Sequence, residues 1–441
     1  MPAPETSAAY FQNALKRSHP NPRVQGGSSP QPLPAQSPPM PPSPQTTPPK
    51  TGSDRFLNGA AKIMTKSWGQ NLFVWLPAIS TDPNTGPTVG LMPVLVIADT
   101  VSHHIRQLLA PSYTYNPLFG QTVTGRYYFY PSEASQLYTA ASFSQHTNRE
   151  LKIRYEDTSA EEGVLYLRGE GYYNVDGSAR FYGIGPQSHK GDETGYTAKD
   201  SVGHATVGIN FLKAWRATLG LQVMRFGVGP NIIPDTTDLN DRFSSVPGNG
   251  TNNTITNDFH LLWDTRDSPI TPTYGSTAEL SIEKTDLGLG SNANYFRYGI
   301  EGRHLFPWAD TRQTTVIHGL FDQANGPNIP FYDLATLGGR TTLRGFGDDR
   351  FEDRGRMVLN IEHRYTFASL GLMGIQTNFE VAPFFDLGTV FPAAEDVQRK
   401  NFQPVYGAAF RAAVKPNVVG DVEIGIGREG PAVFVDINYP Y

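Results

Sequence analysis

The chain has 441 residues, too many for one ordinary compact core, so either several soluble domains or one large closed barrel is expected. Glycine (44 residues) and aromatic residues (12%) are abundant and charged residues make up only 17%, which is unusual for a helical enzyme. The absence of cysteine excludes disulfides and thiol chemistry, and a net charge of −5 provides no basic surface for nucleic acid.

The N-terminal part is rich in proline, with twelve prolines between Pro20 and Pro49. Such a composition cannot bury enough apolar surface to fold, so residues 1–55 are predicted to be a disordered spacer. A ligand for a proline-recognising domain is the alternative. Residues 56–75 are expected to be a short linker or helix, since Asp54–Trp68 places several apolar residues on one helical face. No secretory signal is visible at the N-terminus.

From Leu76 onward the pattern changes to short segments in which apolar and polar residues alternate, separated by Gly, Asn, Asp and Pro. The alternation is clearest in four segments, Gly275–Thr285, Tyr295–Phe306, Arg356–Phe367 and Thr377–Gly388. Strands that cross a lipid bilayer need one apolar face, while the other may be polar and wet. A soluble β-sandwich also alternates, but strands of roughly ten residues recurring over roughly 350 residues are long for a sandwich.

The predicted fold is therefore all-β, a transmembrane antiparallel β-barrel over residues 76–441. Nowhere does an apolar run reach the length of a transmembrane helix, and without such a helix only a closed barrel satisfies the backbone within lipid. We find about seventeen candidate strands and predict about 16, because single-chain bacterial barrels usually have an even number. The expected overcount lies in Gln136–Asp157, where two segments are predicted to form one long strand.

A glycine-rich stretch, Leu337–Phe346, lies in a predicted loop of about 25 residues over 330–354. Loops of that length are uncommon and usually have a function. The strand after the loop and the next strand carry polar residues on their inward faces. The alternation places Glu362, Phe384 and Asp386 there.

These residues resemble the bacterial surface antigen family, the BamA/TamA superfamily of outer-membrane assembly and translocation barrels. The signature of that family is an Arg-Gly-Phe in the sixth extracellular loop, which folds back into the barrel lumen and meets a glutamate and an aspartate on the next two strands. The resemblance implies a loop lock made of Arg344, Gly345, Phe346, Glu362, Phe384, Asp386 and Gly388. A guanidinium suits this role because two carboxylates can grip its planar fork.

Three further segments, Leu262–Pro269, Pro272–Gly275 and Phe181–Pro186, are similar to elements of the same family. The resemblance covers roughly residues 76–441. Full members carry periplasmic POTRA domains before the barrel, and the residues before Leu76 are too few to hold one. The expected protein is thus a short form without POTRA domains.

The C-terminal strand ends on an aromatic residue, which resembles the signal that barrel-assembly machinery recognises by strand addition. Pro431 and Pro440 bracket this strand and cannot donate to a ladder, so its seam with the first strand, near Thr88–Ala98, is predicted to be weak. In the family that seam is a lateral gate for client strands; a plain short closing strand is the other interpretation. The predicted seam residues are Val94, Val433, Val435, Ile437, Tyr439 and Tyr441.

Catalytic and metal-binding interpretations find little support, and neither an enzyme nor a cofactor or metal is predicted. His103 and His104 are adjacent, so on a strand they would point to opposite faces. Gly425, Gly427 and Gly430 are expected to relieve crowding or permit a bend. A barrel esterase with a dispersed Ser/His pair is a minor alternative.

The leading hypothesis is a barrel of the bacterial outer membrane that assists protein or lipid insertion or translocation. Its expected partners are outer-membrane lipids, client outer-membrane proteins and, during biogenesis, the barrel-assembly machinery. The competing hypothesis is a passive pore or structural barrel that kept the loop lock and lost the client activity.

Overall fold

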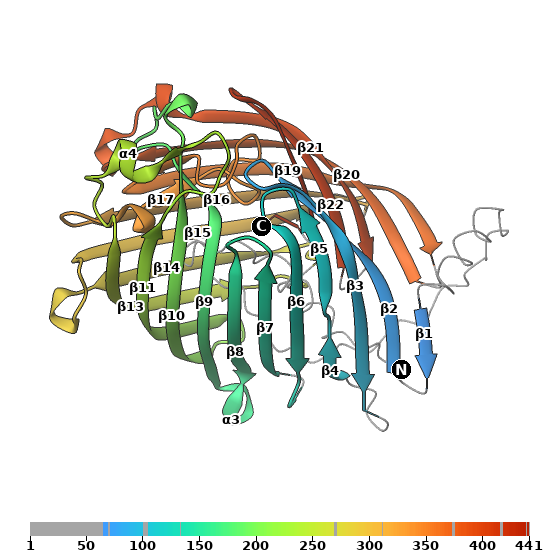
Figure 1. Ribbon diagram of the computed structural model, residues 1–441. Helices are drawn as coiled ribbons and strands as arrows, with labels where there is room; N and C mark the ends of the chain where they lie inside the picture. The colour runs from blue at the N-terminus through green and yellow to red at the C-terminus, as the bar shows by residue number, and fades with distance from the viewer. Residues whose placement is uncertain are drawn as a thin grey trace.

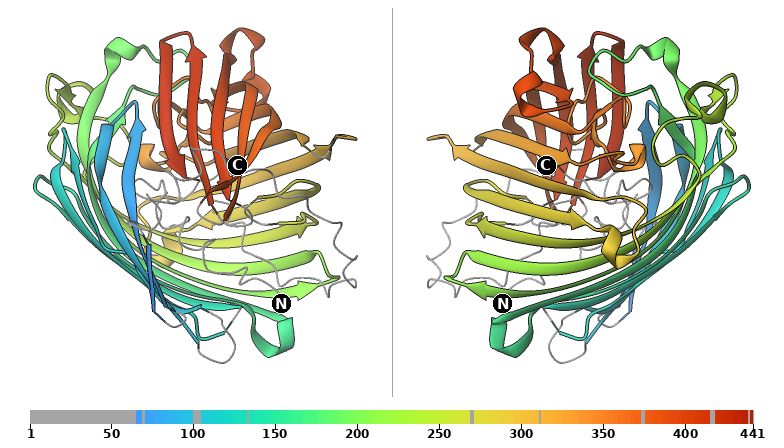
Figure 2. Two further views of the ribbon diagram at one scale, coloured as in Figure 1. Left: turned by 90° about the vertical axis from the view of Figure 1, so that its right-hand side faces the viewer. Right: turned by 90° about the vertical axis from the view of Figure 1, so that its left-hand side faces the viewer.

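The computed structural model describes residues 65–68, 71–99, 105–132, 134–268, 271–310, 312–372, 375–414, 418–437 and 439–440. Over these residues the chain folds into one large antiparallel sheet that curves round a lumen, with the N-terminal strands (blue) returning beside the C-terminal strands (red) (Figure 1). Figure 2 shows the same curvature from two sides. None of the helices in the described ranges is long and apolar enough to cross a membrane.

The strands are long and follow one another along the sheet. In chain order they are β1 (Thr65–Trp68), β2 (Asn71–Asp82), β3 (Gly86–Ala98), β4 (Ile105–Leu109), β5 (Ser112–Asn116), β6 (Gly120–Phe129), β7 (Ser135–Ser144), β8 (Arg149–Ser159), β9 (Leu165–Phe181), β10 (Thr194–Phe211), β11 (Trp215–Gly229), β12 (Thr237–Asp238), β13 (Thr251–Asp264), β14 (Gly275–Thr285), β15 (Tyr295–Pro307), β16 (Gln313–Asn325), β17 (Ala335–Leu337), β18 (Phe351–Asp353), β19 (Gly355–Leu372), β20 (Ile375–Phe391), β21 (Gln403–Val414), β22 (Val418–Gly427) and β23 (Gly430–Ile437).

Helical segments are short and lie between strands. They are α3 (Ala160–Gly163), α4 (Leu239–Phe243) and the 3-10 turns η1 (Lys190–Asp192), η2 (Leu287–Leu289), η3 (Phe331–Asp333), η4 (Ala394–Asp396) and η5 (Arg399–Asn401).

The barrel wall has eighteen strands in the described part of the chain, which confirms the predicted fold class and corrects the count of about 16. The sheet comprises 21 strands, of which β1 and β12 are short additions and β4 and β5 are two halves of one interrupted strand. The expected merger over Gln136–Asp157 is wrong, because β7 and β8 are separate strands that pair with each other.

The interruption between β4 and β5 has a local cause in two prolines. β3 pairs with β4 at Leu109 and with β5 at Tyr113, and the register places Pro93 opposite Pro111. Neither proline has a backbone N–H to give to the ladder, so pairing stops at this point and resumes on the other side.

The N-terminal boundary also differs from the prediction of a linker or helix over 56–75. Residues Thr65–Trp68 and the first part of β2 are strands, and β2 pairs with β3 from Leu72 to Asp82. A short isolated helix is marginal in water, whereas a strand gains a full ladder here. The remainder of the predicted helix and the proline-rich segment 1–55 lie outside the described residues.

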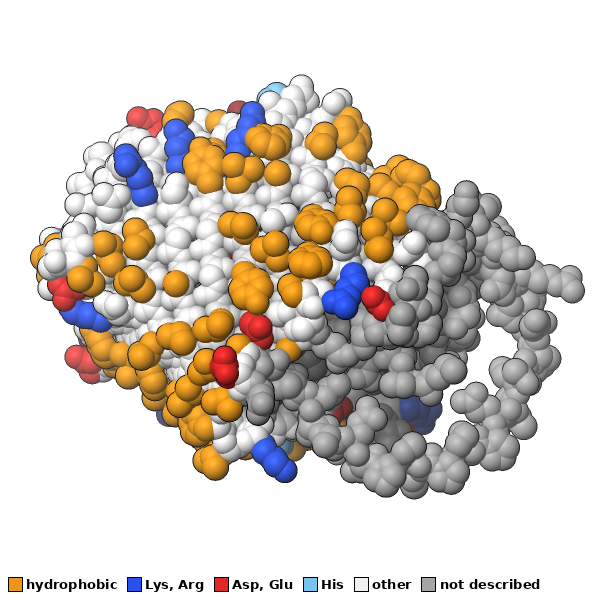
Figure 3. Space-filling model, turned by 90° about the horizontal axis from the view of Figure 1, so that it is seen from below, with side chains coloured by type: hydrophobic (Ala, Val, Ile, Leu, Met, Phe, Trp, Pro, Cys, Tyr) orange, Lys and Arg blue, Asp and Glu red, His pale blue; other side chains and the backbone are white. Residues whose placement is uncertain are grey.

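The two faces of the wall have opposite chemistry. Large apolar side chains are exposed on the outside of nearly every long strand, among them Ile79, Leu91, Val123, Ile153, Val207, Leu219, Leu280, Ile300, Phe410 and Ile426. Figure 3 shows such side chains spread over the outer wall, with few charged groups among them. An exposed apolar surface this extensive is expected where lipid, not water, is the neighbour.

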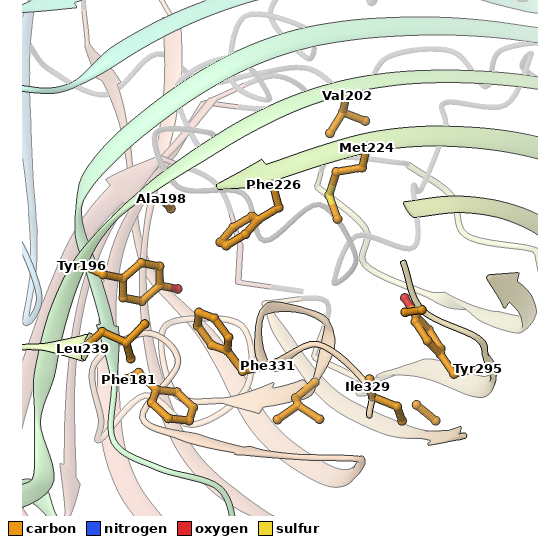
Figure 4. Close-up of a cluster of buried hydrophobic side chains, with 13 residues drawn as sticks. Phe181, Tyr196, Ala198, Val202, Met224, Phe226, Leu239, Tyr295, Ile329 and Phe331 are labelled. Carbon is orange, nitrogen blue, oxygen red and sulfur yellow. The ribbon is translucent and has the colours of Figure 1, made fainter. Parts of the chain in front are cut away.

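The interior is filled partly by side chains and partly by the segment 330–354, which lies within the lumen. Its two short strands, β17 and β18, form a small sheet of their own. A cluster of buried apolar residues joins this segment to the wall strands β9–β11, with Phe331 packed against Phe181 and Tyr196 (Figure 4). The loop is thus a packed part of the core.

Candidate luminal lock and barrel seam

The luminal loop turns sharply between β17 and β18, and its glycines make this possible. Gly338 and Gly339 have φ values of 124° and 77°, a region that side chains with a Cβ rarely adopt. A Cβ on Gly339 would also lie 1.7 Å from Oδ1 of Asp348. The tight turn directs the following arginines, Arg340 and Arg344, toward the last wall strands.

Arg344 is completely buried and its guanidinium is held by three carboxylates. Nε and Nη2 donate to the two oxygens of Asp386 on β20, at 2.9 and 2.7 Å. Nη1 donates to Glu362 on β19 at 2.7 Å and to Glu423 on β22 at 3.2 Å. The backbone N–H of Arg344 donates to Asp386 as well, at 3.2 Å. One residue of the loop therefore connects three strands of the wall.

The aromatic and glycine residues predicted for the lock surround the arginine. The guanidinium carbon of Arg344 lies 3.4 Å from the centre of the Phe384 ring, a cation–π contact in a buried place. Phe346 is 2% exposed and packs edge-on against Phe351, with ring centres 5.1 Å apart. A Cβ on Gly388 would lie 3.2 Å from Leu343, so the loop rests directly on the wall there.

The wall strand next to the loop carries glycines because the loop backbone comes very close to it. A Cβ on Gly425 would lie 2.1 Å from the carbonyl oxygen of Arg344, and one on Gly427 would lie 2.9 Å from the Phe346 ring. On the loop side, a Cβ on Gly345 would lie 2.7 Å from the backbone nitrogen of Gly427. This confirms that Gly425 and Gly427 relieve crowding. Their backbones approach the loop more closely than any side chain would permit.

The carboxylates that hold Arg344 also hold further arginines that sequence reasoning missed. Arg411 on β21 is fully buried and donates to Glu362 at 2.7 Å and to Glu423 at 3.0 Å. Arg364 donates to Glu362 at 2.9 Å, and Arg340 from the loop donates to Glu423 at 3.0 Å. The eight members of this luminal cluster are Arg340, Arg344, Arg364, Arg411, Glu362, Asp386, Asp421 and Glu423.

Charge is balanced among the buried members of the luminal cluster, with four guanidinium groups and four carboxylates. Arg340 also pairs with a fifth carboxylate, Asp436 at 3.2 Å, which is partly exposed. Balance matters because each charge has lost most of its water, a loss that costs several kcal/mol per ion unless partners replace it. Removing one member would leave an uncompensated charge.

The alternation of β21 and β22 could have placed Arg411, Asp421 and Glu423 on the inward face, since Phe410, Val422 and Ile424 point outward.

The barrel closes between β2 and β23, so the predicted partner of the last strand is wrong. Val94 lies on β3 and pairs with Val74 of β2, one strand away from the seam. Over the described residues, β2 and β23 share a single paired position, Thr81 with Val435. β2 is fully paired with β3 on its other side, and β23 with β22 along Gly430–Ile437. The seam is the weakest ladder of the barrel wall described here.

The other predicted seam residues are distributed differently. Val433 faces outward and pairs with Ile424, while Ile437 pairs with Gly420 on the side away from β2. Tyr439 is buried in the lumen, where its hydroxyl donates to Glu380 at 2.9 Å and its ring lies 3.7 Å from the Arg364 guanidinium carbon. The strand has ended by then, so its alternation no longer determines the side. Tyr441 lies outside the described residues.

The remaining family-like segments lie at turns. Arg266 donates through Nε and Nη2 to both oxygens of Asp264, which stiffens the connection between β13 and β14. In the segment after β9, the N–H of Gly185 donates to the carbonyl of Glu352 on β18 at 2.8 Å, so this segment pairs with the luminal loop. No group of three His, Asp or Glu side chains able to hold a metal ion occurs among the described residues.

An antiparallel barrel with an apolar outer wall, a charged lumen and an inserted loop defines an integral protein of the bacterial outer membrane. The model of the Omp85 superfamily domain matches residues 133–414, more than half of the chain, and the chain belongs to the Omp85 superfamily. Barrels of this family are non-enzymatic membrane transport and assembly proteins.

The chain is similar to solved structures at low sequence identity, and one of them shares the fold. BamA from Haemophilus ducreyi lacking POTRA domains 1–3 matches with a TM-score of 0.54 and 15% identity, over 83% of this chain and 75% of that one. CdiB from Escherichia coli matches with a TM-score of 0.48 and 11% identity, over 84% of this chain and 63% of that one. The chain thus spans less than two thirds of that relative. No protein of curated function matches the chain in sequence.

Proposed function

We propose that this Omp85 barrel assists the insertion or translocation of outer-membrane proteins through the seam between β2 and β23. The observation that carries the proposal is the single paired position of that seam, Thr81 with Val435. On its seam edge β2 pairs with β1 over Asn71–Val74, and between Trp75 and Ser80 the described residues of this edge have no ladder partner. A client strand would find there a template for strand addition, the mode in which main-chain hydrogen bonds supply the affinity.

The luminal loop supports this proposal because it fixes one side of the seam. Arg340 donates to Asp421 and Glu423 on β22 at 2.5 and 3.0 Å and to Asp436 on β23 at 3.2 Å. Together with the contacts of Arg344, these bonds attach the last strands of the barrel to the loop. In this proposal the loop acts as a lock that holds the C-terminal side of the seam by ion pairs, while the N-terminal side, which the turn after β2 joins to the loop through the bond of Asn84 to the carbonyl of Asp348 at 3.0 Å, moves more easily.

A passive pore is the second candidate function, and the charged lumen favours it. A cavity of about 330 Å³ lies between the loop and the wall, lined by charged and polar side chains together with aromatic rings. An ion path through such a lumen would be blocked or opened by the loop. The two functions make opposite demands on the seam, since a pore conducts with the seam closed whereas an insertase needs it to open.

A cysteine pair distinguishes the two functions, and the chain has no native cysteine to interfere. The variant Thr81→Cys/Val435→Cys would tie the seam at its one paired position. The matched control is Ile79→Cys/Val89→Cys, which ties β2 to β3 across an ordinary ladder on the same outer face.

Complementation of a deletion strain by the oxidised and the reduced variants is the readout. We expect the oxidised seam variant to lose complementation and to regain it on reduction, while the control complements in both states. Full complementation by the oxidised seam variant would refute the insertion proposal. Conductance in planar bilayers that persists with the seam tied would then support the pore.

A further inference from the structure

A cavity inside the barrel separates the luminal loop from the wall strands β9, β10 and β11. Its volume is about 330 Å³, within the range of pockets that hold small organic molecules. Wall residues of these three strands line one side, and residues of the loop from Phe331 to Glu352 line the other. The ends of β2 and β23, from Ser80 to Asn84 and from Phe434 to Asp436, complete the lining together with Arg356 of β19. Arg340 of the luminal cluster and Thr81 and Val435 of the seam line it as well, but the wall that carries Asp200 takes part in neither the lock nor the seam.

Two buried carboxylates face this cavity without the partners that buried charges need. Glu352 on β18 is 5% exposed, and its side chain makes no hydrogen bond or ion pair with the described residues. Asp200 on β10 is 6% exposed; its side chain is hydrogen-bonded to the neutral Asn174, but its Oδ1 has no hydrogen-bond partner among those residues. Buried polar groups are satisfied almost everywhere in proteins, so two such carboxylates lining one cavity indicate a missing cationic partner.

The arginines that line the same cavity are already engaged elsewhere. Arg180 donates to Glu193 at 2.7 Å, Arg356 donates to Asp322 at 2.5 Å, and Arg340 belongs to the luminal cluster. None of them neutralises Glu352 or Asp200. Asp176 and Asp349 line the cavity too, so its field is negative.

Aromatic rings complete the lining on the side of η3. Phe226 and Tyr332 are stacked with ring centres 3.8 Å apart, and Phe331 lies edge-on to Tyr196 at 5.4 Å. Figure 4 shows Tyr196, Phe226 and Phe331 facing one another between the wall and the loop. Carboxylates combined with ring faces suit an organic cation, because rings attract ammonium and guanidinium groups through their quadrupoles.

A bare metal ion fits this arrangement poorly. Metal sites need several donors converging on one point, and no such group of three occurs among the described residues. The carboxylates stand on opposite sides of the cavity, one on the loop and one on the wall. We propose that this cavity binds an organic cation, a compound with at least two amine or guanidine groups, which bridges Glu352 and Asp200.

Protonation should be linked to this binding. Burial, together with the neighbouring charge of Asp349, raises the pKa of Glu352 well above its usual range. The other acidic and phenolic groups facing it are Asp176 and Asp200 on the wall and Tyr196. A bound cation would favour the ionised carboxylate, so binding releases a proton and strengthens as the pH rises.

Calorimetry of the full chain in detergent micelles tests the proposal with spermidine as the probe. We expect saturable binding that is tighter at pH 8 than at pH 6, and proton release that appears as a dependence of the heat on the buffer. Glu352→Gln and Asp200→Asn should each weaken binding about ten- to hundredfold, the value of one charged hydrogen bond. Asp310→Asn, on an exposed turn, is the control and should leave binding unchanged.

Several outcomes would overturn the proposal. These are the absence of saturable spermidine binding, affinities equal in the wild type and both variants, or full displacement of spermidine by an equal concentration of Mg²⁺. Circular dichroism checks that each variant folds. If one of the two variants does not fold, the binding affinity of the other variant decides, because the two carboxylates lie on different elements. Thr81 and Val435 of the seam also line this cavity, so the tied-seam variant is not used in the binding measurement. Glu352 and Asp200 belong to neither seam strand, and calorimetry of their variants therefore tests the site separately from complementation.

Discussion

Removal of the Asp386 carboxylate is the sharpest test of the loop lock. Asp386 accepts two bonds from the Arg344 guanidinium, one from the Arg344 backbone and one from Nδ2 of Asn360 at 2.8 Å. The variant Asp386→Ala would leave the luminal cluster with one uncompensated positive charge. Breaking a fully buried pair in this way costs about 3–5 kcal/mol. The loop alone can relieve the imbalance, because Arg344 can leave the wall whereas Arg411 is held within a strand.

Limited proteolysis with trypsin measures this cost, since the loop carries four arginines, Arg340, Arg344, Arg350 and Arg354. When opening is fast relative to cleavage, the cleavage rate follows the open population. A loss of 3–5 kcal/mol raises that population by a factor of about one hundred to several thousand. Fragments cut within 330–354, identified by mass spectrometry, should therefore appear far sooner in the variant than in the wild type.

The control for this experiment is Asp310→Ala, which removes an Asp–Arg pair of similar geometry at an exposed turn. Exposed pairs contribute little, so the cleavage rate of the loop should not change. Equal loop cleavage in the wild type and in Asp386→Ala would refute the reasoning, because it would mean that the buried pair does not hold the loop in place.

Three further predictions concern neighbouring features. Gly425→Ala would place a methyl group against the loop backbone and should destabilise the folded barrel by about 1–3 kcal/mol in a thermal unfolding experiment. Gly420→Ala, on the same strand but facing open space, should not destabilise it, and equal effects of the two variants would contradict the close approach. Burial raises the pKa of Asp353 to about 6, so ionisation of this carboxyl opposes folding, and the free energy of unfolding should fall as the pH rises from about 4 to 6. Asp353→Asn should abolish this pH dependence, and a pH dependence that persists in the variant would exclude Asp353 as its source. Tyr439→Phe removes a buried hydrogen bond to a carboxylate and should lower the free energy of unfolding by about 1.5–3 kcal/mol, whereas Tyr406→Phe on the exposed face should leave it unchanged. Equal unfolding temperatures for the two variants would count against the inward position of Tyr439.

The alternation of apolar and polar residues predicted the fold class and the inward faces of the lock strands. Glu362 and Asp386 could be placed because a strand has a period of two, and each lies within a long regular ladder. The same argument would have reached Arg411 and Glu423. Arg340 was beyond it, because this residue lies in an irregular turn whose course depends on the glycine conformations around it.

Closure of the barrel was predicted less well, since it depends on contacts between the ends of the chain. Residues 56–75 are predicted to be a linker or helix and the first strand is placed near Thr88–Ala98, so the prediction misses β2 and assigns Val94 of β3 to the seam. Tyr439 follows the apolar alternation of the last strand in sequence but turns into the lumen after the strand ends. Local periodicity contains no information about which edge strand comes first or where the last one departs.

The contacts of the loop also indicate from which end the seam would open. At the end near the loop, Asn84 in the turn after β2 donates to the carbonyl of Asp348 at 3.0 Å, and Arg340 reaches Asp436 on β23 at 3.2 Å. The one paired position, Thr81 with Val435, lies at this same end. Farther along, the described residues of the two strands do not pair with each other: Asn71–Val74 of β2 pair with β1 on this edge, and after β23 the chain turns into the lumen at Tyr439. Because the loop holds both strands at one end only, separation should begin at the opposite end, and weakening the loop should release the seam as a whole.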